Sequence, residues 1–305
     1  MPYIIKKFIP RPLIYSYHFF LAKFACFYYG NPSKKMIVIG VTGTNGKSTT
    51  VRLIAEALMA LGHKVGFVST SEIQIGENRY LNDMKMTMPG KLILQKFLKE
   101  MLDAKCAYAV IETSSQGVEQ YRHIGINYDV AVFTNLTPEH IEAHGGFENY
   151  KKAKGKFFSH LTKTPRKIIQ GKKIKKIIVV NLDDAHAPFF LQFFADIKIG
   201  FGTSGSYDIA GIEELRAQDI DLKPGSSRFS LRDTAFSTNL LGIHNVYNAL
   251  AALSAVFGLG LKIQKAQHAF ENIIVPGRME FINEGQDFTV IVDYAPEPQG
   301  VSKLY

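Results

Sequence analysis

The run GVTGTNGKSTT, from Gly40 to Thr50, carries the residues of this sequence that are best suited to chemistry. Its glycines stand at 40, 43 and 46, directly before Lys47 and Ser48. The common phosphate loop reads GxxxxGK[ST], and its first glycine would fall on Val41 here, so the spacing is a variant. Glycines let successive backbone N–H groups point at a phosphate, a following lysine reaches the β- and γ-phosphates, and a serine holds Mg²⁺. The run therefore predicts a nucleotide-phosphate site.

Alternating strands and helices must position this loop. Apolar runs predict strands at 36–42, 64–70, 108–114, 129–135 and 176–181. Helical spacing predicts helices over 47–62 and 87–105 between them. This rhythm indicates an α/β fold with a mostly parallel P-loop sheet flanked by helices.

Polar residues gather where the predicted strands end. They are Thr42 to Ser48, Thr70, Glu112, Asn135 and Asp183. Ligands of open α/β sheets bind beyond the carboxyl ends of the strands, so we expect these groups to meet around one site.

The second half of the chain changes character twice. Residues 197–241 are rich in Gly, Ser and Asp, which predicts a small antiparallel excursion, and an alanine-rich helix follows in 242–260. Near Pro276 new strands begin. We expect an apolar helical extension over 1–35, an ATP-binding central domain over 36–275, and the start of an incomplete C-terminal domain over 276–305.

Composition limits the class of protein. The 305 residues are 46% hydrophobic and 21% charged, as in globular proteins, with a formal net charge of +9. The basic runs within 151–176 are not interleaved with a regular aromatic pattern, which argues against a nucleic-acid groove. Lys172 to Lys176 are interpreted as a solvated basic face. Cys26 and Cys106 suggest neither a metal site nor a disulfide framework, so a cytoplasmic protein is expected.

Residues 12–29 form an aromatic-rich apolar stretch broken by His18 and Lys23. A spanning helix needs about 20 mostly apolar residues, so this one is marginal. Two interpretations stay open: a helix that docks on the protein, and a helix that lies in a membrane interface and makes the protein peripheral at the inner face.

Several blocks in order resemble the Mur ligase superfamily of ATP-dependent carboxylate–amine ligases. The matching blocks are TGTNGKST in the loop, ETSSQGVEQYR (112–122), FTNLTPEHIEAHGGFENYKKAK (133–154), GIHNVYNALAA (242–252) and GRMEFI (277–282). The sequence most resembles the UDP-N-acetylmuramyl-tripeptide synthetases, the MurE type, which serve peptidoglycan synthesis.

The resemblance implies that an amino acid is added to a UDP-muramyl-peptide through an acyl phosphate, with release of ADP. Such a reaction rests on positioning and on cationic stabilisation of phosphoryl oxygens. By resemblance, Lys47 acts with two Mg²⁺ ions, of which Ser48 and Glu112 hold the first. Glu112 and His140 belong to the second ion, together with Lys154, which the family carries as a CO₂-derived carbamate.

Further site residues follow from the same resemblance. The ATP-binding residues are Gly43, Thr44, Asn45, Gly46, Lys47, Ser48, Thr49, Asn135, His244, Asn245, Arg278 and Asp293. The residues expected to contact the UDP-muramyl-peptide are Thr87, Ser114, Gln120 and Arg122.

The match departs from the family at both ends. The usual uridine-binding N-terminal domain and most of the C-terminal domain are not seen, and Pro296 replaces a family histidine. Alternatives are another ligase of the superfamily, of the folylpolyglutamate type or acting on a lipid-linked precursor, and a nucleotide-binding remnant without catalysis.

Overall fold

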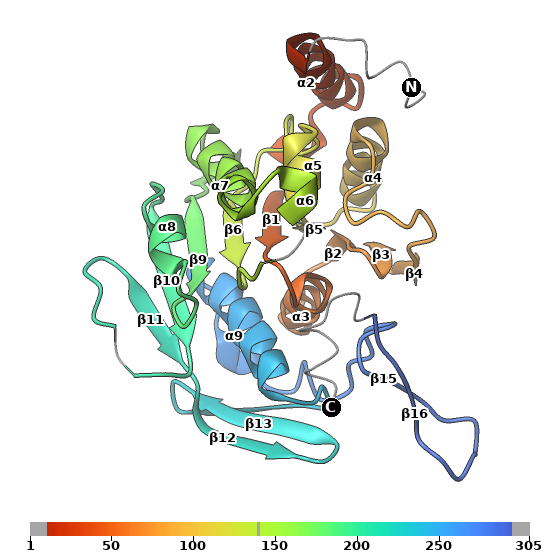
Figure 1. Cartoon of the computed structure of the whole chain (residues 1–305), viewed down its shortest axis with the longest axis vertical. Helices are drawn as coiled ribbons and strands as arrows, with labels where there is room; N and C mark the ends of the chain where they lie inside the picture. Colours follow the sequence, from red (N-terminus) through yellow and green to blue (C-terminus); the bar gives the residue numbers. More distant parts are fainter. Residues whose placement is uncertain (1–10, 139–140, 206, 295–305) are drawn as a thin grey trace.

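A computed structural model describes residues 11–138, 141–205 and 207–294, and its centre is one nine-stranded sheet (Figure 1). The strands of this sheet, in spatial order, are β11 (Glu213–Arg216), β10 (Ile197–Gly202), β9 (Ile177–Asn181), β6 (Val130–Phe133), β1 (Ile37–Thr42), β5 (Tyr108–Glu112), β2 (Val65–Val68), β3 (Glu72–Ile75) and β4 (Asn78–Leu81). Every pairing from β11 to β2 is parallel, whereas β3 and β4 join antiparallel at one edge. The α/β fold with a mostly parallel sheet is confirmed.

Helices cover both faces of the sheet. The helical elements in chain order are α2 (Arg11–Tyr28), η1 (Pro32–Lys34), α3 (Lys47–Ala60), α4 (Lys91–Asp103), α5 (Ser115–Glu119), α6 (Ile141–His144), α7 (Phe147–Lys163), α8 (Ala187–Leu191), α9 (Ile243–Gly258) and η2 (Ile263–Ala266). Alternate strand residues point to opposite faces, so Ile39 and Val41 pack with α3 and α9, while Val38 packs with α4 and α7. Burial on both faces explains why these strands are continuous apolar runs.

The region 197–241 is only partly the antiparallel excursion that its composition predicts. Its first part supplies β10 and β11, which extend the main parallel sheet beside β9. Only β12 (Gln218–Lys223), β13 (Ser226–Leu231) and β14 (Thr234–Thr238) form a separate antiparallel sheet. The prediction was therefore wrong for residues 197–216, because buried apolar positions such as Ile199, Phe201 and Leu215 outweigh the Gly- and Ser-rich composition.

Two short hairpins complete the described chain. They are β7 (Ile168–Ile169) with β8 (Lys172–Lys173), and β15 (Glu280–Ile282) with β16 (Val290–Val292). The second hairpin follows the predicted boundary near Pro276 and lies away from the main sheet (Figure 1).

Helix α2 caps the end of the molecule at which the central strands begin (Figure 1). Its inner face, with Ala22, Ala25 and Cys26, is buried, and Cys26 Sγ donates to the Gly125 carbonyl at 3.0 Å. The predicted docking on the protein is thus confirmed for this face. Within the described residues, none of the helices is both long enough and apolar enough to cross a bilayer.

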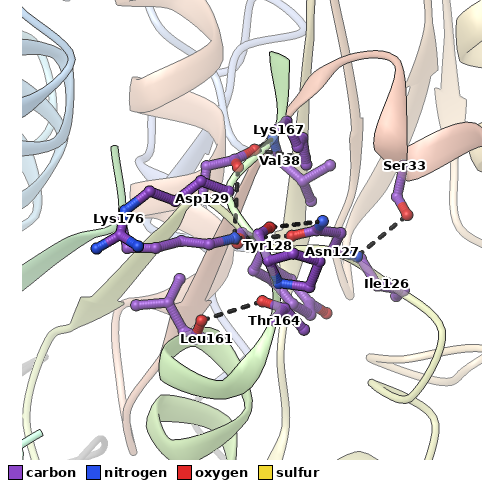
Figure 2. A network of polar contacts seen from close by, with 12 residues as sticks. Ser33, Val38, Ile126, Asn127, Tyr128, Asp129, Leu161, Thr164, Lys167 and Lys176 are labelled. Carbon is purple, nitrogen blue, oxygen red and sulfur yellow. Dashed lines mark hydrogen bonds and ion pairs between the residues drawn. The ribbon is translucent and has the colours of Figure 1, made fainter. Parts of the chain in front are cut away.

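A buried charge cluster fixes the starting ends of the central strands (Figure 2). Asp129, just before β6, accepts a hydrogen bond from Val38 N at 2.9 Å and pairs with Lys167 Nζ at 2.5 Å and Lys176 Nζ at 3.6 Å. Lys176 also donates to Asn127 Oδ1 at 2.7 Å. Lys172 and Lys173 are solvated as predicted, but the prediction was wrong for Lys176, which is buried because it opens β9 against Asp129.

Candidate active site

The loop between β1 and α3 is shaped by two glycines at which a Cβ atom would collide with a neighbouring side chain. Gly46 has φ +79°, and a Cβ atom there would lie 2.1 Å from Asn248 Oδ1. A Cβ atom on Gly43 would lie 1.9 Å from Thr134 Oγ1. The loop can follow this tight course because both positions lack side chains.

The end of the neighbouring strand β6 holds the loop in place. Asn135 Oδ1 accepts from Asn45 N at 2.9 Å, and Asn135 Nδ2 donates to Asn45 O at 3.0 Å. Thr44 N donates to Asn135 O at 2.9 Å, and Thr134 Oγ1 donates to Asn45 O at 2.8 Å. The loop is therefore preorganised by contacts within the protein rather than by a ligand.

A buried carboxylate lies beside the first turn of α3. Glu112, at the end of β5, accepts from Ser48 Oγ at 2.8 Å and from Thr70 N at 2.7 Å. Thr70 Oγ1 lies 3.0 Å from both Glu112 Oε1 and Thr87 Oγ1. The strand ends thus bring together Ser48, Glu112, Thr70 and Thr87, which are distant in sequence.

Two lysines from different helices reach back to the loop. Lys47 Nζ donates to Thr44 O at 2.6 Å, and Lys154 Nζ donates to Gly43 O at 2.6 Å. Lys154 is only 1% exposed, and its Nζ lies 4.5 Å from the centroid of the Tyr150 ring. Two cations beside one glycine-rich loop suit a polyanionic ligand such as a triphosphate.

These groups open into a pocket of about 280 Å³. The predicted ATP-binding residues that line it are Thr44, Asn45, Gly46, Lys47, Ser48, Thr49, Asn135, His244, Asn245, Arg278 and Asp293. Gly43 lies in the same loop but does not line the pocket. The α9 wall is ordered by a hydrogen bond of 2.9 Å from Asn248 Nδ2 to Asn245 Oδ1. On the opposite wall Asp293 Oδ2 accepts from Met279 N at 2.7 Å.

Sequence reasoning missed several lining residues. Thr137, Asn181, Tyr247, Asn248 and Tyr294 also face this pocket. Tyr247 and Asn248 lie one helical turn after the predicted His244, so helical spacing could have indicated them. Asn181 ends β9, and its Nδ2 donates to Thr134 O at 2.8 Å, which places it in the row of polar strand ends.

The residues predicted for the sugar side do not line the nucleotide pocket, although Thr87 connects to it through Thr70. Ser114 Oγ caps α5 by accepting from Gly117 N at 3.1 Å. Arg122 donates to the Met88 carbonyl and, at 2.6 Å, to Gln120 Oε1. Arg122 and Gln120 are therefore paired with each other beside the turn that carries Thr87.

The donors predicted for the first Mg²⁺ ion fit that ion. A serine hydroxyl and a carboxylate are hard oxygen ligands, and Ser48 and Glu112 are already in contact. His140, predicted for the second ion, lies outside the described residues. Among the described residues, no group of three or more His, Cys, Asp or Glu side chains could by itself hold a metal.

Comparison with known proteins agrees with this geometry. Residues 41–256 match the family model described as the Mur ligase middle domain. The chain is 37% identical over 279 residues to the UDP-N-acetylmuramoyl-L-alanyl-D-glutamate–2,6-diaminopimelate ligase of Geobacillus thermodenitrificans, covering 90% of this chain and 54% of that protein. It is 37% identical over 292 residues to the UDP-N-acetylmuramyl-tripeptide synthetase of Roseiflexus sp., covering 93% and 56%.

A solved UDP-N-acetylmuramoyl-L-alanyl-D-glutamate–2,6-diaminopimelate ligase superposes with a TM-score of 0.70 at 29% identity, covering 88% of this chain and 53% of that one. The chain thus spans a little over half the length of the curated relatives it matches. Because the family model covers most of the sequence, the chain belongs to the Mur ligase family.

Proposed function

We propose that this chain is the nucleotide-binding and catalytic part of an ATP-dependent, ADP-forming ligase that adds an amino acid to a UDP-N-acetylmuramyl-peptide in peptidoglycan synthesis. The observation that carries the proposal is the Ser48–Glu112 hydrogen bond inside a pocket bounded by the glycine loop and by Arg278 and Asp293. A serine hydroxyl beside a buried carboxylate supplies the oxygen ligands that a nucleotide-bound Mg²⁺ ion needs.

The chemistry balances without any redox partner. The acceptor carboxylate oxygen attacks the γ-phosphorus and ADP leaves; the amine nitrogen then attacks the acyl carbon, phosphate leaves with the C–O electron pair, and the amine loses a proton. Each step develops negative charge on phosphoryl oxygens. The nearby ammonium of Lys47 and the guanidinium of Arg278 would stabilise that charge, because preorganised cations need little reorganisation.

Bound Mg²⁺ would neutralise phosphate charge and orient the γ-phosphoryl group. Ser48 and Glu112 would hold one ion, and Glu112, His140 and a carbamate on Lys154 would serve a second. The position of Lys154 supports this assignment, because its buried Nζ lies 2.6 Å from Gly43 O in the glycine loop. The carbamate would turn this cation into an anionic oxygen ligand.

On the acceptor side we assign Thr87, Ser114, Gln120 and Arg122 to the sugar nucleotide. Arg122 suits a phosphate or carboxylate because its guanidinium can donate two parallel hydrogen bonds. We further propose that residues 36–275 form the nucleotide-binding unit and that the β15–β16 hairpin begins the next unit, which contributes Arg278 and Asp293 to the pocket.

The test is the dependence of ADP release on the acceptor. With ATP, Mg²⁺ and an amino acid, ADP should form when UDP-N-acetylmuramyl-dipeptide is present, and Lys47→Ala should abolish its formation while the exposed control Lys172→Ala retains it. ADP formation that requires a folate instead would indicate a folylpolyglutamate-type ligase. Nucleotide binding without turnover on any carboxylate would favour the non-catalytic alternative.

A further inference from the structure

Helix α2 carries a large apolar surface that the fold leaves uncovered. Opposite its buried inner face lies an outer stripe, which we define as Leu13, Tyr17, Phe20, Phe24 and Phe27. These residues recur at i, i+4, i+7, i+11 and i+14, so they line one side of the helix, and they are 57–79% exposed. A contiguous apolar patch of this kind indicates an interaction surface, whereas a single exposed apolar residue does not.

The charged side chains of α2 and of the segment that follows it all have the same sign. No aspartate or glutamate precedes Glu56 in the sequence, whereas Lys23, Lys34 and Lys35 lie within or just after α2. Lys23 stands at the flank of the stripe, with its Nζ 5.7 Å from the centroid of the Phe19 ring. An apolar helix face with cationic flanks suits an anionic lipid surface.

A basic pocket of about 320 Å³ lies beside this flank, between α7 and the segment after α5. Lys156, Ser159 and Lys163 line it from one face of α7. Lys156 pairs with Glu119 at 2.6 Å, but Lys163 has no ion-pair partner among the described residues. The pocket also contains His123, whose buried Nδ1 has no hydrogen-bond partner in the described chain.

One hydrogen bond connects the segment that lines this pocket to α2. The lining residue Ile124 precedes Gly125, whose carbonyl accepts the Cys26 hydrogen bond from the inner face of α2. The inner face of α2 is therefore anchored to the segment that forms one side of the pocket.

We propose that α2 binds the surface of an anionic phospholipid bilayer, with the outer stripe in the boundary between headgroups and acyl chains and with Lys23 and Lys163 facing anionic headgroups. A second copy of the chain would bring Lys23 and its neighbours against like charges, whereas an anionic bilayer supplies the complementary charge. Because α2 and the nucleotide pocket lie at opposite ends of the strands, the bound protein would keep its nucleotide pocket open to solution (Figure 1).

Vesicle sedimentation tests the proposal without depending on ligase activity. The chain should co-sediment with vesicles of phosphatidylcholine and phosphatidylglycerol, and much less with phosphatidylcholine alone.

Phe20→Ser with Phe24→Ser should weaken partitioning at least about tenfold, because two aromatic rings leave the lipid boundary. Lys23→Gln with Lys163→Gln should weaken it by about fivefold per lysine on anionic vesicles only. The matched control is Phe288→Ser, an exposed aromatic residue of the β15–β16 hairpin.

A second measurement is independent of the stability of the serine variants. The chain contains no tryptophan, so Phe24→Trp supplies its sole tryptophan. Its emission should shift to the blue on addition of the anionic vesicles, and that of Phe288→Trp should not shift. Absence of co-sedimentation and of the blue shift would overturn the proposal. So would a dimer in solution that the double serine variant abolishes, since the stripe would then face a second copy.

Discussion

Ser48 Oγ donates a hydrogen bond of 2.8 Å to Glu112 Oε2 and so joins the first turn of α3 to the end of β5. The two residues are 64 positions apart, and parallel pairing of β1 with β5 brings them together by setting Val41 opposite Glu112. Thr70 adds two further hydrogen bonds to the same carboxylate. The carboxyl group of Glu112 is thereby held beside the position where a loop-bound cation would lie.

Glu112→Gln should remove the Mg²⁺ dependence of nucleotide binding. The amide keeps the shape and accepts the Ser48 hydrogen bond, but it lacks the charge that attracts the ion. We expect metal-assisted affinity for ADP to fall at least about tenfold in titration calorimetry. The control Glu77→Gln, at a side chain that is 92% exposed, should bind as the parent does. Equal Mg²⁺ dependence in both variants would remove Glu112 from the metal site.

Gly46→Ala should abolish nucleotide binding through a collision as well as through strain. Its Cβ would lie 2.1 Å from Asn248 Oδ1, at a backbone φ of +79°. Gly62→Ala is a matched control, because Gly62 has φ +83° and no atom within 4 Å of its Cβ position. Both variants should lose about 1–2 kcal/mol of unfolding free energy from the left-handed backbone. Only the first should lose ADP binding, and retention by both would contradict the steric account of the loop.

Lys154 should carry the carbamate. With ¹³C-labelled bicarbonate, the parent chain should show a carbamate carbon resonance that Lys154→Ala lacks and that the exposed control Lys152→Ala keeps. Lys154→Ala should also lose turnover without rescue by bicarbonate. A resonance that survives in Lys154→Ala would assign the carbamate elsewhere, and near-normal turnover would remove Lys154 from the site.

Asp129→Asn should destabilise the fold by about 3–5 kcal/mol, because two buried lysines would lose their anion. Asp221→Asn is the control, since Asp221 and Lys223 form an exposed pair and should contribute within about 1 kcal/mol. Chemical denaturation at neutral pH compares the two. A loss in Asp129→Asn no larger than in the control would show that the cluster in Figure 2 does not support the strands.

The stability of Asp129→Asn and that of Asp221→Asn should depend on pH in different ways. Burial lowers the pKa of Lys167 to about 8, although Asp129 raises it. In the unfolded chain this lysine keeps its higher, ordinary pKa, so above about pH 8 the unfolded chain binds more protons than the folded chain. Lys167 therefore makes the free energy of unfolding rise with pH until the pH reaches the pKa of the unfolded lysine. Without the charge of Asp129, the pKa of Lys167 in the folded chain falls further. The pH range over which stability rises therefore extends to lower pH. As the pH rises from about 7 to about 9, the free energy of unfolding of Asp129→Asn should therefore increase more than that of Asp221→Asn.

The features that were predicted correctly from the sequence are those that local residue patterns determine. The loop from Gly43 to Ser48 needs only adjacent residues and a strand before a helix, and the parallel sheet follows from repeated apolar runs. Glu112 and Asn135 were predicted at strand ends, and strand pairing explains why they meet the loop.

Long-range packing decided the features that were missed. Tyr247 and Asn248 could have been indicated by their helical spacing from His244, but the packing of α9 beside α3 that brings them to the pocket depends on long-range contacts. Lys176 follows a run of solvated lysines, and its burial depends on Asp129, which lies 47 residues earlier in the chain. Strands β10 and β11 were assigned to the wrong sheet because composition does not report which neighbour a strand pairs with.

Oxygen transfer tests the proposed ligase chemistry most directly. The acceptor UDP-N-acetylmuramyl-dipeptide would be labelled with ¹⁸O in its reacting carboxylate and incubated with the chain, ATP, Mg²⁺ and the amino acid. If an acyl phosphate forms in this pocket, each amide bond made should leave one ¹⁸O atom in the inorganic phosphate, as read by mass spectrometry. Phosphate that forms with the amide but carries no label would contradict the account.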